Sequence, residues 1–421
     1  MNNEAMAPRR VVVTGYGCIN SLGENSAEVW DALRAYQVGY KPVDFDNEFM
    51  KARFFSFIEE RKERFAGFPK PVLRALPLFA KYALVAVREA VNMAFGTPDR
   101  IIDCYNPFDC GVILGTGWGG LDQAFDIRDE YRESKLCSSL ATLISMPSIA
   151  TGACSLHWNL RGYQNTVIAA CATGTMAIGD AYEVIRSGRA SMMIAGGSES
   201  LRSENNVWSI DVLQALSKER SDPVRACCPF SRDRSGFVLA EGAAVLCLEE
   251  REQAIKRGAT IYGEITGYGN FSDARDFTAP AADMGARVRS IQTALKAAGK
   301  RPEQIDYINA HGTSTPMNDL NESNSIKASL GEAAYRIPVS STKSYTGHLI
   351  AAAGSFESIV CLKAIETGLL PATIHLNSPD PECDLDYIPN EHRQMARVDT
   401  TLNLSFGFGG SNAALVIERA A

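Results

Sequence analysis

Apolar and polar positions along the chain alternate between two kinds of segment. Short continuous apolar runs bounded by glycine are typical of strands covered on both faces, and they fall at residues 10–15, 111–114 and 191–196. Longer stretches show the 3.6-residue period of amphipathic helices, and they fall at residues 27–33, 76–94, 172–186, 285–298 and 320–330. This alternation predicts an α/β protein whose sheets are mostly buried.

One short segment occurs twice. The first predicted strand ends in Val13-Thr-Gly-Tyr-Gly17, and the segment at 263–269 ends in the same Thr-Gly-Tyr-Gly. Gly-Tyr-Gly at a strand end is also ordinary turn chemistry, so the match alone is weak evidence for a duplication. We nevertheless expect two similar halves, residues 1–258 and 259–421, with a charged helix at 249–257 leading to the join.

Length and composition indicate a folded protein with a large core. The chain has 421 residues, of which 46% are hydrophobic and 22% charged, and these are the proportions of globular proteins. The first ten residues contain no apolar signal segment, and nowhere do eighteen apolar residues follow one another. We therefore expect a soluble, cytoplasmic protein that does not enter a membrane.

Cysteine spacing and net charge exclude some classes of protein and one class of binding partner. The eleven cysteines are scattered, and only Cys227 and Cys228 are close in sequence, which fits neither a disulfide framework nor a zinc ribbon. The net charge of −7 argues against nucleic acid as a general partner, because a phosphate-binding surface needs a basic field.

Cys171 is the candidate nucleophile. It lies between an apolar run at 166–170, predicted as a strand, and a predicted helix start at 172–180. The positive end of a helix favours a thiolate, and unpaired N–H groups there can bind an oxyanion. The alternative is an inert, buried structural cysteine.

Two of the five histidines lie in glycine-bearing turns. His311 follows a predicted strand in Ile308-Asn-Ala-His-Gly-Thr-Ser-Thr-Pro316, and His348 ends the segment 339–348 before a predicted helix at 349–354. One cysteine and two histidines could also bind zinc, but no second close-spaced ligand pair supports a metal site. We expect no metal and a catalytic role for all three residues.

In combination, these residues resemble the β-ketoacyl-acyl carrier protein synthases, and among them the elongating synthase II type. Four motifs carry the resemblance, which covers nearly the whole chain: Ala170-Cys-Ala-Thr-Gly174, the segment 309–316, Ser341-Thr-Lys-Ser-Tyr-Thr-Gly-His348, and the closing segment 403–413 with its Gly-Phe-Gly-Gly loop. The resemblance implies a duplicated thiolase fold of five α-β-α-β-α layers, a homodimer, an acyl carrier protein as partner and no cofactor. It implies condensation of an acyl-thioester primer with malonyl-acyl carrier protein, giving a 3-oxoacyl product two carbons longer.

The resemblance also implies residue roles. Cys171 would carry the acyl chain as a thioester, and the backbone N–H groups of Cys171 and Phe408 would form the oxyanion hole. His311 and His348 would hydrogen-bond the malonyl thioester carbonyl, and Lys343 would be the buried cation that orders the cluster. The remaining positions are the acids that pair with this lysine or with the backbone (Asp319, Glu322), the pantetheine contacts (Thr313, Thr315), the hinged gate (Phe406, Phe408) and a substrate-contacting Phe237.

Several positions depart from the family pattern. Trp118 stands where long-chain synthases carry a smaller aliphatic residue in the acyl tunnel, so we expect a shortened or reshaped substrate pocket; the alternative is an indole turned into the core. Other departures are Ser231, Ser235, Asn318 and Ala351. Together they suggest a specialised enzyme, for instance one that builds polyene chains.

A basic segment is the candidate docking surface for the carrier protein. Acyl carrier proteins are acidic, and residues 51–74 form the densest basic segment of the chain, with Arg74 closest to a docking position of the family. A solvated helix face explains the charges about as well.

Other functions remain as alternatives. A degradative thiolase would need a second cysteine near the C-terminus, where Gly-Phe-Gly-Gly stands instead, and a non-catalytic chain-length subunit would lack the nucleophile. Two alternatives stay open: the active subunit of a heterodimeric ketosynthase/chain-length-factor pair, and a synthase that decarboxylates malonyl units to make starters.

Overall fold

A ten-stranded mixed sheet organises the chain. The computed structural model describes residues 8–97 and 100–420, and the strand order is β11-β10-β14-β15-β9-β1-β8-β6-β4-β5. These strands are β1 (Val11–Ile19), β4 (Cys110–Gly115), β5 (Gln164–Asn165), β6 (Met192–Glu199), β8 (Gly242–Glu250), β9 (Gly263–Ser272), β10 (Tyr307–Asn309), β11 (Val339–Ser340), β14 (Thr400–Gly407) and β15 (Ser411–Glu418). Two small sheets join β2 (Lys41–Pro42), β3 (Phe54–Ser56) and β7 (Leu239–Ala240), and β12 (Leu369–Leu370) with β13 (Arg393–Gln394).

The sheet consists of the same five-strand arrangement twice. Strand β1 is antiparallel to β8, β8 is antiparallel to β6, and β6, β4 and β5 are parallel. Strands β9, β15, β14, β10 and β11 repeat that order and those directions, and β1 pairs with β9 to join the two sets. The predicted duplicated α/β fold is therefore confirmed, whereas the division at residue 258 stays a prediction.

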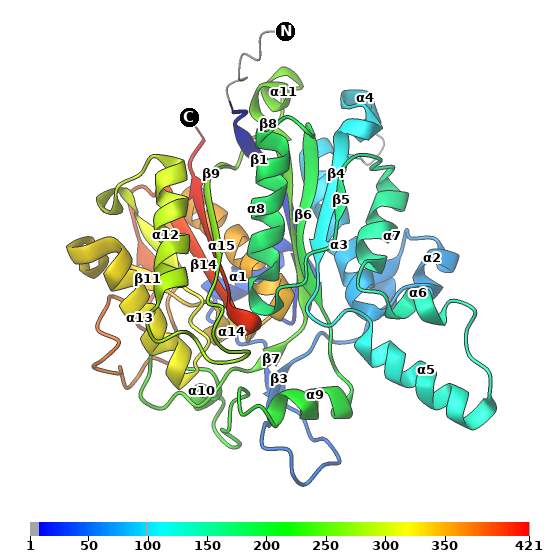
Figure 1. The fold of residues 1–421 in the computed structure, drawn as a ribbon, viewed down its shortest axis with the longest axis horizontal. Coiled ribbons are helices and arrows are strands. Elements are labelled where there is room, and N and C mark those ends of the chain that lie inside the picture. Colours follow the sequence, from blue (N-terminus) through cyan, green and yellow to red (C-terminus); the bar gives the residue numbers. More distant parts are fainter. Residues whose placement is uncertain (1–7, 98–99, 421) are drawn as a thin grey trace.

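Helices form three layers around the two halves of the sheet (Figure 1). On one outer side α3 (Leu78–Phe95) contacts β1 and β8, and α7 (Ile149–Trp158) contacts β4; on the other, α12 (Gly285–Ala298) contacts β9 and β15, with α13 (Pro316–Leu330) against α12. Between the halves lie α8 (Thr173–Arg186) and α15 (Ala353–Thr367), each of which contacts strands of both halves. The remaining helices are α1 (Ser26–Arg34), α2 (Lys70–Arg74), α4 (Arg100–Cys104), α5 (Leu121–Ser134), α6 (Ala141–Ser145), α9 (Glu204–Asp211), α10 (Pro223–Ala226), α11 (Arg251–Lys256) and α14 (Lys343–Thr346).

The repeated Gly-Tyr-Gly has a structural reason in this fold. A Cβ on Gly15 or Gly17 would lie 2.3 or 2.2 Å from a backbone carbonyl oxygen of α3, and one on Gly267 or Gly269 would lie 2.0 or 2.1 Å from a carbonyl oxygen of α12. In each half, only glycine at these positions lets the outer helix pack this closely on its strand.

The tyrosines of the two repeats, Tyr16 and Tyr268, face the central helix layer, and each forms a hydrogen bond with a helix of the other half. The Tyr16 hydroxyl donates to Glu366 on α15, and the Tyr268 hydroxyl donates to Asp180 on α8, both at 3.3 Å. Each half thus places its tyrosine against the central helix of the other half.

Most predicted elements are present, and three differ. Residues 166–170 are not a strand: only Gln164–Asn165 pair with β4, because the Ala169 N–H turns to the Thr173 hydroxyl at 2.9 Å and Ala170 takes a positive φ of 46°. A 3₁₀ turn, η3 (Ala170–Ala172), therefore precedes α8. The helix predicted at 349–354 is a 3₁₀ turn, η6 (Ile350–Ala352), followed by the longer α15, and the first residues of the segment 249–257 belong to β8.

No helix in the described part of the chain combines the length and the apolar character needed to cross a bilayer.

Candidate active site

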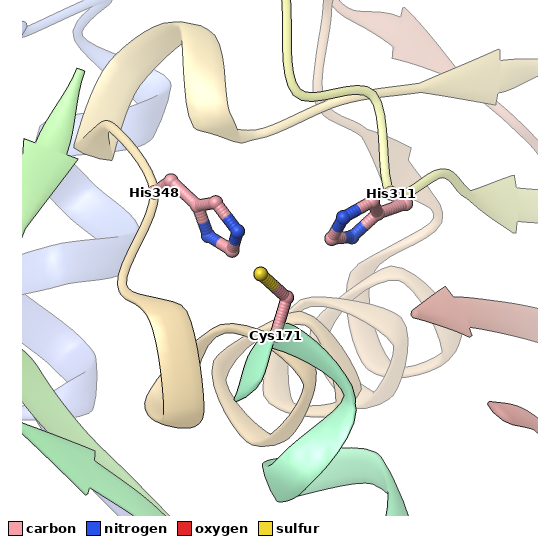
Figure 2. A group of neighbouring side chains, drawn as sticks. All are labelled: Cys171, His311 and His348. Atoms are coloured by element: carbon pink, nitrogen blue, oxygen red, sulfur yellow. The ribbon is translucent and has the colours of Figure 1, made fainter. Parts of the chain in front are cut away.

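Cys171, His311 and His348 meet in one buried cluster (Figure 2). Cys171 lies in η3 at the start of α8, His311 follows β10, and His348 precedes η6, so the two halves contribute together. The cysteine sulfur and one ring nitrogen of each histidine all lie within 4.8 Å of one another. All three residues line a cavity of about 420 Å³, which is within the usual size of small-molecule sites.

The end of β14 is pressed against the turn that carries the cysteine. A Cβ on Gly407 would lie 2.7 Å from the Ala169 carbonyl oxygen and 3.2 Å from the Cys171 nitrogen. Because Gly407 has no side chain, the next residue, Phe408, can place its backbone N–H beside the Cys171 sulfur.

Burial dominates the chemistry of the thiol. It raises the pKa of Cys171 to about 11, although the charge of Lys343 and the N–H groups of Phe408 and Cys171 favour the thiolate. The N–H groups at the helix start thus act in the expected direction, but the desolvation of the charged form outweighs them. The backbone N–H groups of Cys171 and Phe408 are directed at the sulfur, where they can donate hydrogen bonds to a negatively charged oxygen.

Both histidines are neutral at physiological pH. Burial lowers the pKa of each ring well below its ordinary value, and the neighbouring Lys343 charge lowers both further. The Ile350 N–H donates to His348 Nδ1 at 3.2 Å, so the His348 proton is on Nε2. Within the described residues that Nε2 and His311 Nδ1 have no hydrogen-bond partner. The rings lie 5.3 Å apart at 82°, leaving polar nitrogens free for a ligand.

Lys343 is 1% exposed and pairs with Glu357 on α15, which is equally buried. The sequence analysis missed Glu357. Its signal is a single carboxylate within the otherwise small and apolar segment 349–362, where an unpaired charge would be costly.

The two predicted acids bind backbone groups and not Lys343. Glu322 accepts the N–H groups of His311 and Gly312, each at 2.7 Å, and so holds the histidine turn in place. Asp319 accepts the Phe230 N–H at 2.9 Å.

The other predicted residues divide into two groups. Thr313, Thr315, Phe237, Phe406 and Phe408 all line the cavity. The two threonine hydroxyls are 2.9 Å apart, the Phe237 ring packs edge-on to His348 at 5.1 Å, and Phe406 packs against His311 at 5.9 Å. Trp118 does not line this cavity; it is half-buried against a hydrophobic cluster that contains Phe237 and Ile350.

Two family models match the chain, "Beta-ketoacyl synthase, N-terminal domain" over residues 8–254 and "Beta-ketoacyl synthase, C-terminal domain" over residues 262–377. The chain belongs to the β-ketoacyl synthase family. This synthase is 39% identical over 416 residues to 3-oxoacyl-[acyl-carrier-protein] synthase 2 of Synechocystis sp., covering 98% of both chains. It is 38% identical over 425 residues to the enzyme of the same name from Staphylococcus aureus, again covering 98% of both.

Solved structures of ketosynthases share this fold. A type II polyketide synthase acyl-carrier protein in complex with its ketosynthase, bound to the hexaketide, matches with a TM-score of 0.90 at 34% identity, covering 98% of this synthase and 100% of that chain. The ishigamide ketosynthase/chain length factor matches with a TM-score of 0.88 at 30% identity, covering 99% and 100%.

Nearby carboxylates pair with several of the basic residues in the segment 51–74, the candidate docking surface for the carrier protein. Arg53 pairs with Asp44, and Arg61 and the buried Arg64 pair with Glu24, whereas Arg74 is exposed at the end of α2. Two further cations, Lys218 and Arg287, line the cavity itself, and the sequence analysis singled out neither.

Proposed function

We propose that this synthase catalyses the decarboxylative condensation of an acyl primer with malonyl-acyl carrier protein, giving a 3-oxoacyl-acyl carrier protein two carbons longer. The supporting observation is the convergence of Cys171 with the neutral His311 and His348 in one cavity of a β-ketoacyl synthase.

In the first half-reaction the Cys171 sulfur attacks the primer's thioester carbonyl. The carbonyl oxygen becomes negative and accepts the N–H groups of Cys171 and Phe408, which already lie beside the sulfur. The carbon–sulfur bond to the carrier breaks, and the thiol proton of Cys171 ends on the departing carrier thiol. Because burial holds that proton on the sulfur, proton loss must accompany attack.

In the second half-reaction the malonyl thioester oxygen accepts hydrogen bonds from His311 and His348. The bond from the α-carbon to the carboxylate breaks, carbon dioxide leaves, and the electron pair passes into an enolate. The enolate carbon then attacks the acyl carbonyl on Cys171, and the sulfur leaves and regains a proton from solvent. Neutral imidazoles suit this step, because they donate to the developing oxyanion and add no charge of their own.

Cavity residues position the substrate in this proposal. Thr313 and Thr315 contact the pantetheine arm, and Phe237 packs beside it. Phe406 and Phe408 form the gate, and Gly409, with its φ of +78°, is a hinge that a larger side chain would strain.

We further propose an acyl carrier protein as partner, a homodimer as assembly and a cytoplasmic location. The carrier-bound ketosynthase supports the partner by analogy. All eleven cysteines are free, which is typical of a reducing compartment. The ketosynthase/chain length factor supports a heterodimer as the alternative, and native mass spectrometry of the chain purified alone distinguishes a homodimer from a monomer that awaits a partner.

Substrate length is a separate proposal that rests on Trp118. We propose that its indole limits the space for long acyl chains, although it packs beside the cavity wall and not on the cavity. Trp118→Ile is expected to extend the longest primer accepted, measured over a series of saturated acyl carriers. Efficient elongation of long saturated chains by the unmodified protein would refute this.

The decisive experiment is intact-mass spectrometry of the protein with acyl carrier thioesters, followed by malonyl-carrier addition, with Cys171→Ala as control. We expect acyl mass only when Cys171 is present, and its loss to a 3-oxoacyl product on the carrier. Acetyl-carrier formation without condensation would favour the starter-making decarboxylase. No acylation by any donor would contradict the proposed nucleophile.

A further inference from the structure

Arg287 is a buried cation in the catalytic cavity to which the proposed mechanism gives no task. It lies in the first turn of α12, is 5% exposed, and lines the same cavity as Cys171 and His311. A cation at this end of a helix is opposed by the helix dipole.

Within the described part of the chain the guanidinium has no ion-pair partner, and two of its nitrogens have no hydrogen-bond partner. Its Nε and Nη1 have no hydrogen bond, and no carboxylate oxygen there lies within the 4.0 Å of an ion pair. Burial lowers the pKa of Arg287 to about 10, against the opposing attraction of Glu322, Asp273 and Asp319, and it remains charged at neutral pH.

The three nearby acids are engaged elsewhere. Glu322 binds the backbone of the His311 turn, Asp319 binds the Phe230 N–H, and Asp273 accepts the Asn412 amide at 2.9 Å. None of them is free to turn toward Arg287 without giving up a bond that holds the site.

Phe406 fixes the orientation of the cation. The guanidinium carbon lies 4.2 Å from the centre of the Phe406 ring, whose other neighbour is His311. Stacking engages the face of a guanidinium, whereas its N–H groups point outward in the guanidinium plane. Those N–H groups can therefore meet a planar anion in the cavity.

We propose that Arg287 is a binding site for a carboxylate carried by the thioester substrate. The two oxygens of a carboxylate match the forked N–H donors of a guanidinium, and its negative charge would balance the buried positive charge of Arg287. This inference rests on the proposed function, which brings such a group into the cavity in every cycle as the malonyl carboxylate. A carboxylate at the far end of a dicarboxylic primer is the other source of the same chemistry.

The test measures binding and not turnover. In Cys171→Ala protein, dissociation constants are measured by calorimetry for stable amide analogues of malonyl-, acetyl- and succinyl-pantetheine, with and without Arg287→Met. We expect Arg287→Met to weaken the malonyl ligand roughly tenfold to a hundredfold and to leave the acetyl ligand unchanged, with partial rescue by Arg287→Lys. Loss confined to the succinyl ligand would assign the site to a dicarboxylic primer.

Two controls separate a binding role from a structural one. Lys218→Met removes an exposed cation from the same cavity and is expected to change the malonyl and acetyl constants by the same factor. Arg287→Met is expected not to lower the midpoint of thermal unfolding, because it removes a buried charge that has no ion-pair partner and leaves an apolar side chain to pack on Phe406. An unchanged preference for acidic over neutral ligands in Arg287→Met overturns the inference.

The outcome is distinct from that of the proposed function. A protein that binds malonyl-pantetheine through Arg287 but condenses nothing refutes the proposed reaction and leaves this site standing. A protein that condenses normally, yet whose Arg287→Met variant binds all three ligands unchanged, refutes this site alone.

Discussion

Gly407→Ala tests whether the contact between the end of β14 and the cysteine turn sustains catalysis. The new Cβ would stand 2.7 Å from the Ala169 carbonyl oxygen, and real Cβ contacts essentially never fall below 3.0 Å. The two backbones must therefore separate by at least about 0.3 Å, and by about 0.7 Å to reach ordinary contact at 3.4 Å. Alanine can adopt the backbone dihedral angles of Gly407, φ −108° and ψ 156°, without strain. The substitution therefore acts only through the steric clash of its Cβ.

The size of the effect follows from the role of the next residue. Oxyanion donors act over about 2.7–3.1 Å, so a shift of this size moves the Phe408 N–H to the edge of its range. Losing one such donor costs about 2.7–4 kcal/mol, or roughly a hundredfold to a thousandfold in rate. We expect acylation of Cys171 to slow by about that factor, with a loss of about 1–3 kcal/mol in the free energy of unfolding from overpacking.

The assay is the rate at which acyl mass appears on Cys171, with the folded fraction measured by circular dichroism. Gly15→Ala is the matched control, because its Cβ would meet an α3 carbonyl oxygen at 2.3 Å, away from the site. It should lose stability but keep its acylation rate per folded molecule. If Gly407→Ala acylates within about twofold of the unmodified protein, the reasoning about the oxyanion hole is wrong.

Four further predictions concern the thiol, the buried ion pair and metal binding. Because the pKa of Cys171 is about 11, alkylation of this thiol by iodoacetamide should speed up about tenfold per pH unit from pH 7 to 9; a plateau in that range would contradict the raised pKa. The pKa is raised from 9.0, so the thiol's contribution to folding stability is complete below pH 9 and is lost as the pH rises through about 11. Glu357→Gln leaves the Lys343 charge buried and unpaired and should cost about 3–5 kcal/mol of unfolding free energy in denaturant titrations, against about 1 kcal/mol or less for Asp31→Asn at an exposed pair. Dialysis against a chelator should leave the acylation rate unchanged, and restoration of a lost rate by zinc would instead make the cysteine and the histidines metal ligands.

The sequence predicts best those elements whose periodicity agrees with their burial. The helix expected at 285–298 begins and ends at those residues, and the apolar run at 191–196 forms most of β6. Residues 166–170 look equally strand-like, but the hydrogen bond from the Ala169 N–H to the Thr173 hydroxyl and the positive φ of Ala170 turn them away from the sheet. An apolar pattern does not show such competition.

The sequence predicts which residues belong to the site, but it does not predict which of them pair with one another. Motifs in single turns identify Cys171, His311 and His348, whereas the Lys343–Glu357 pair depends on how two helices meet. The sequence does not predict the burial of Arg287, because a lone arginine in an amphipathic helix is usually solvated. The fold encloses it against Phe406. For Trp118, the sequence suggested a tunnel residue, and the structure places its ring against a neighbouring cluster.

The crossed tyrosines carry a consequence for heat inactivation. The nucleophile comes from one half of the chain and both histidines from the other, so the cluster exists only while the halves hold their relative position. Tyr16 and Tyr268 reach across that seam to opposite central helices, one of which begins directly after the Cys171 turn. A displacement of one half relative to the other would separate the Cys171 sulfur from the imidazoles while both halves are still folded. We therefore expect activity to be lost on heating at a lower temperature than secondary structure.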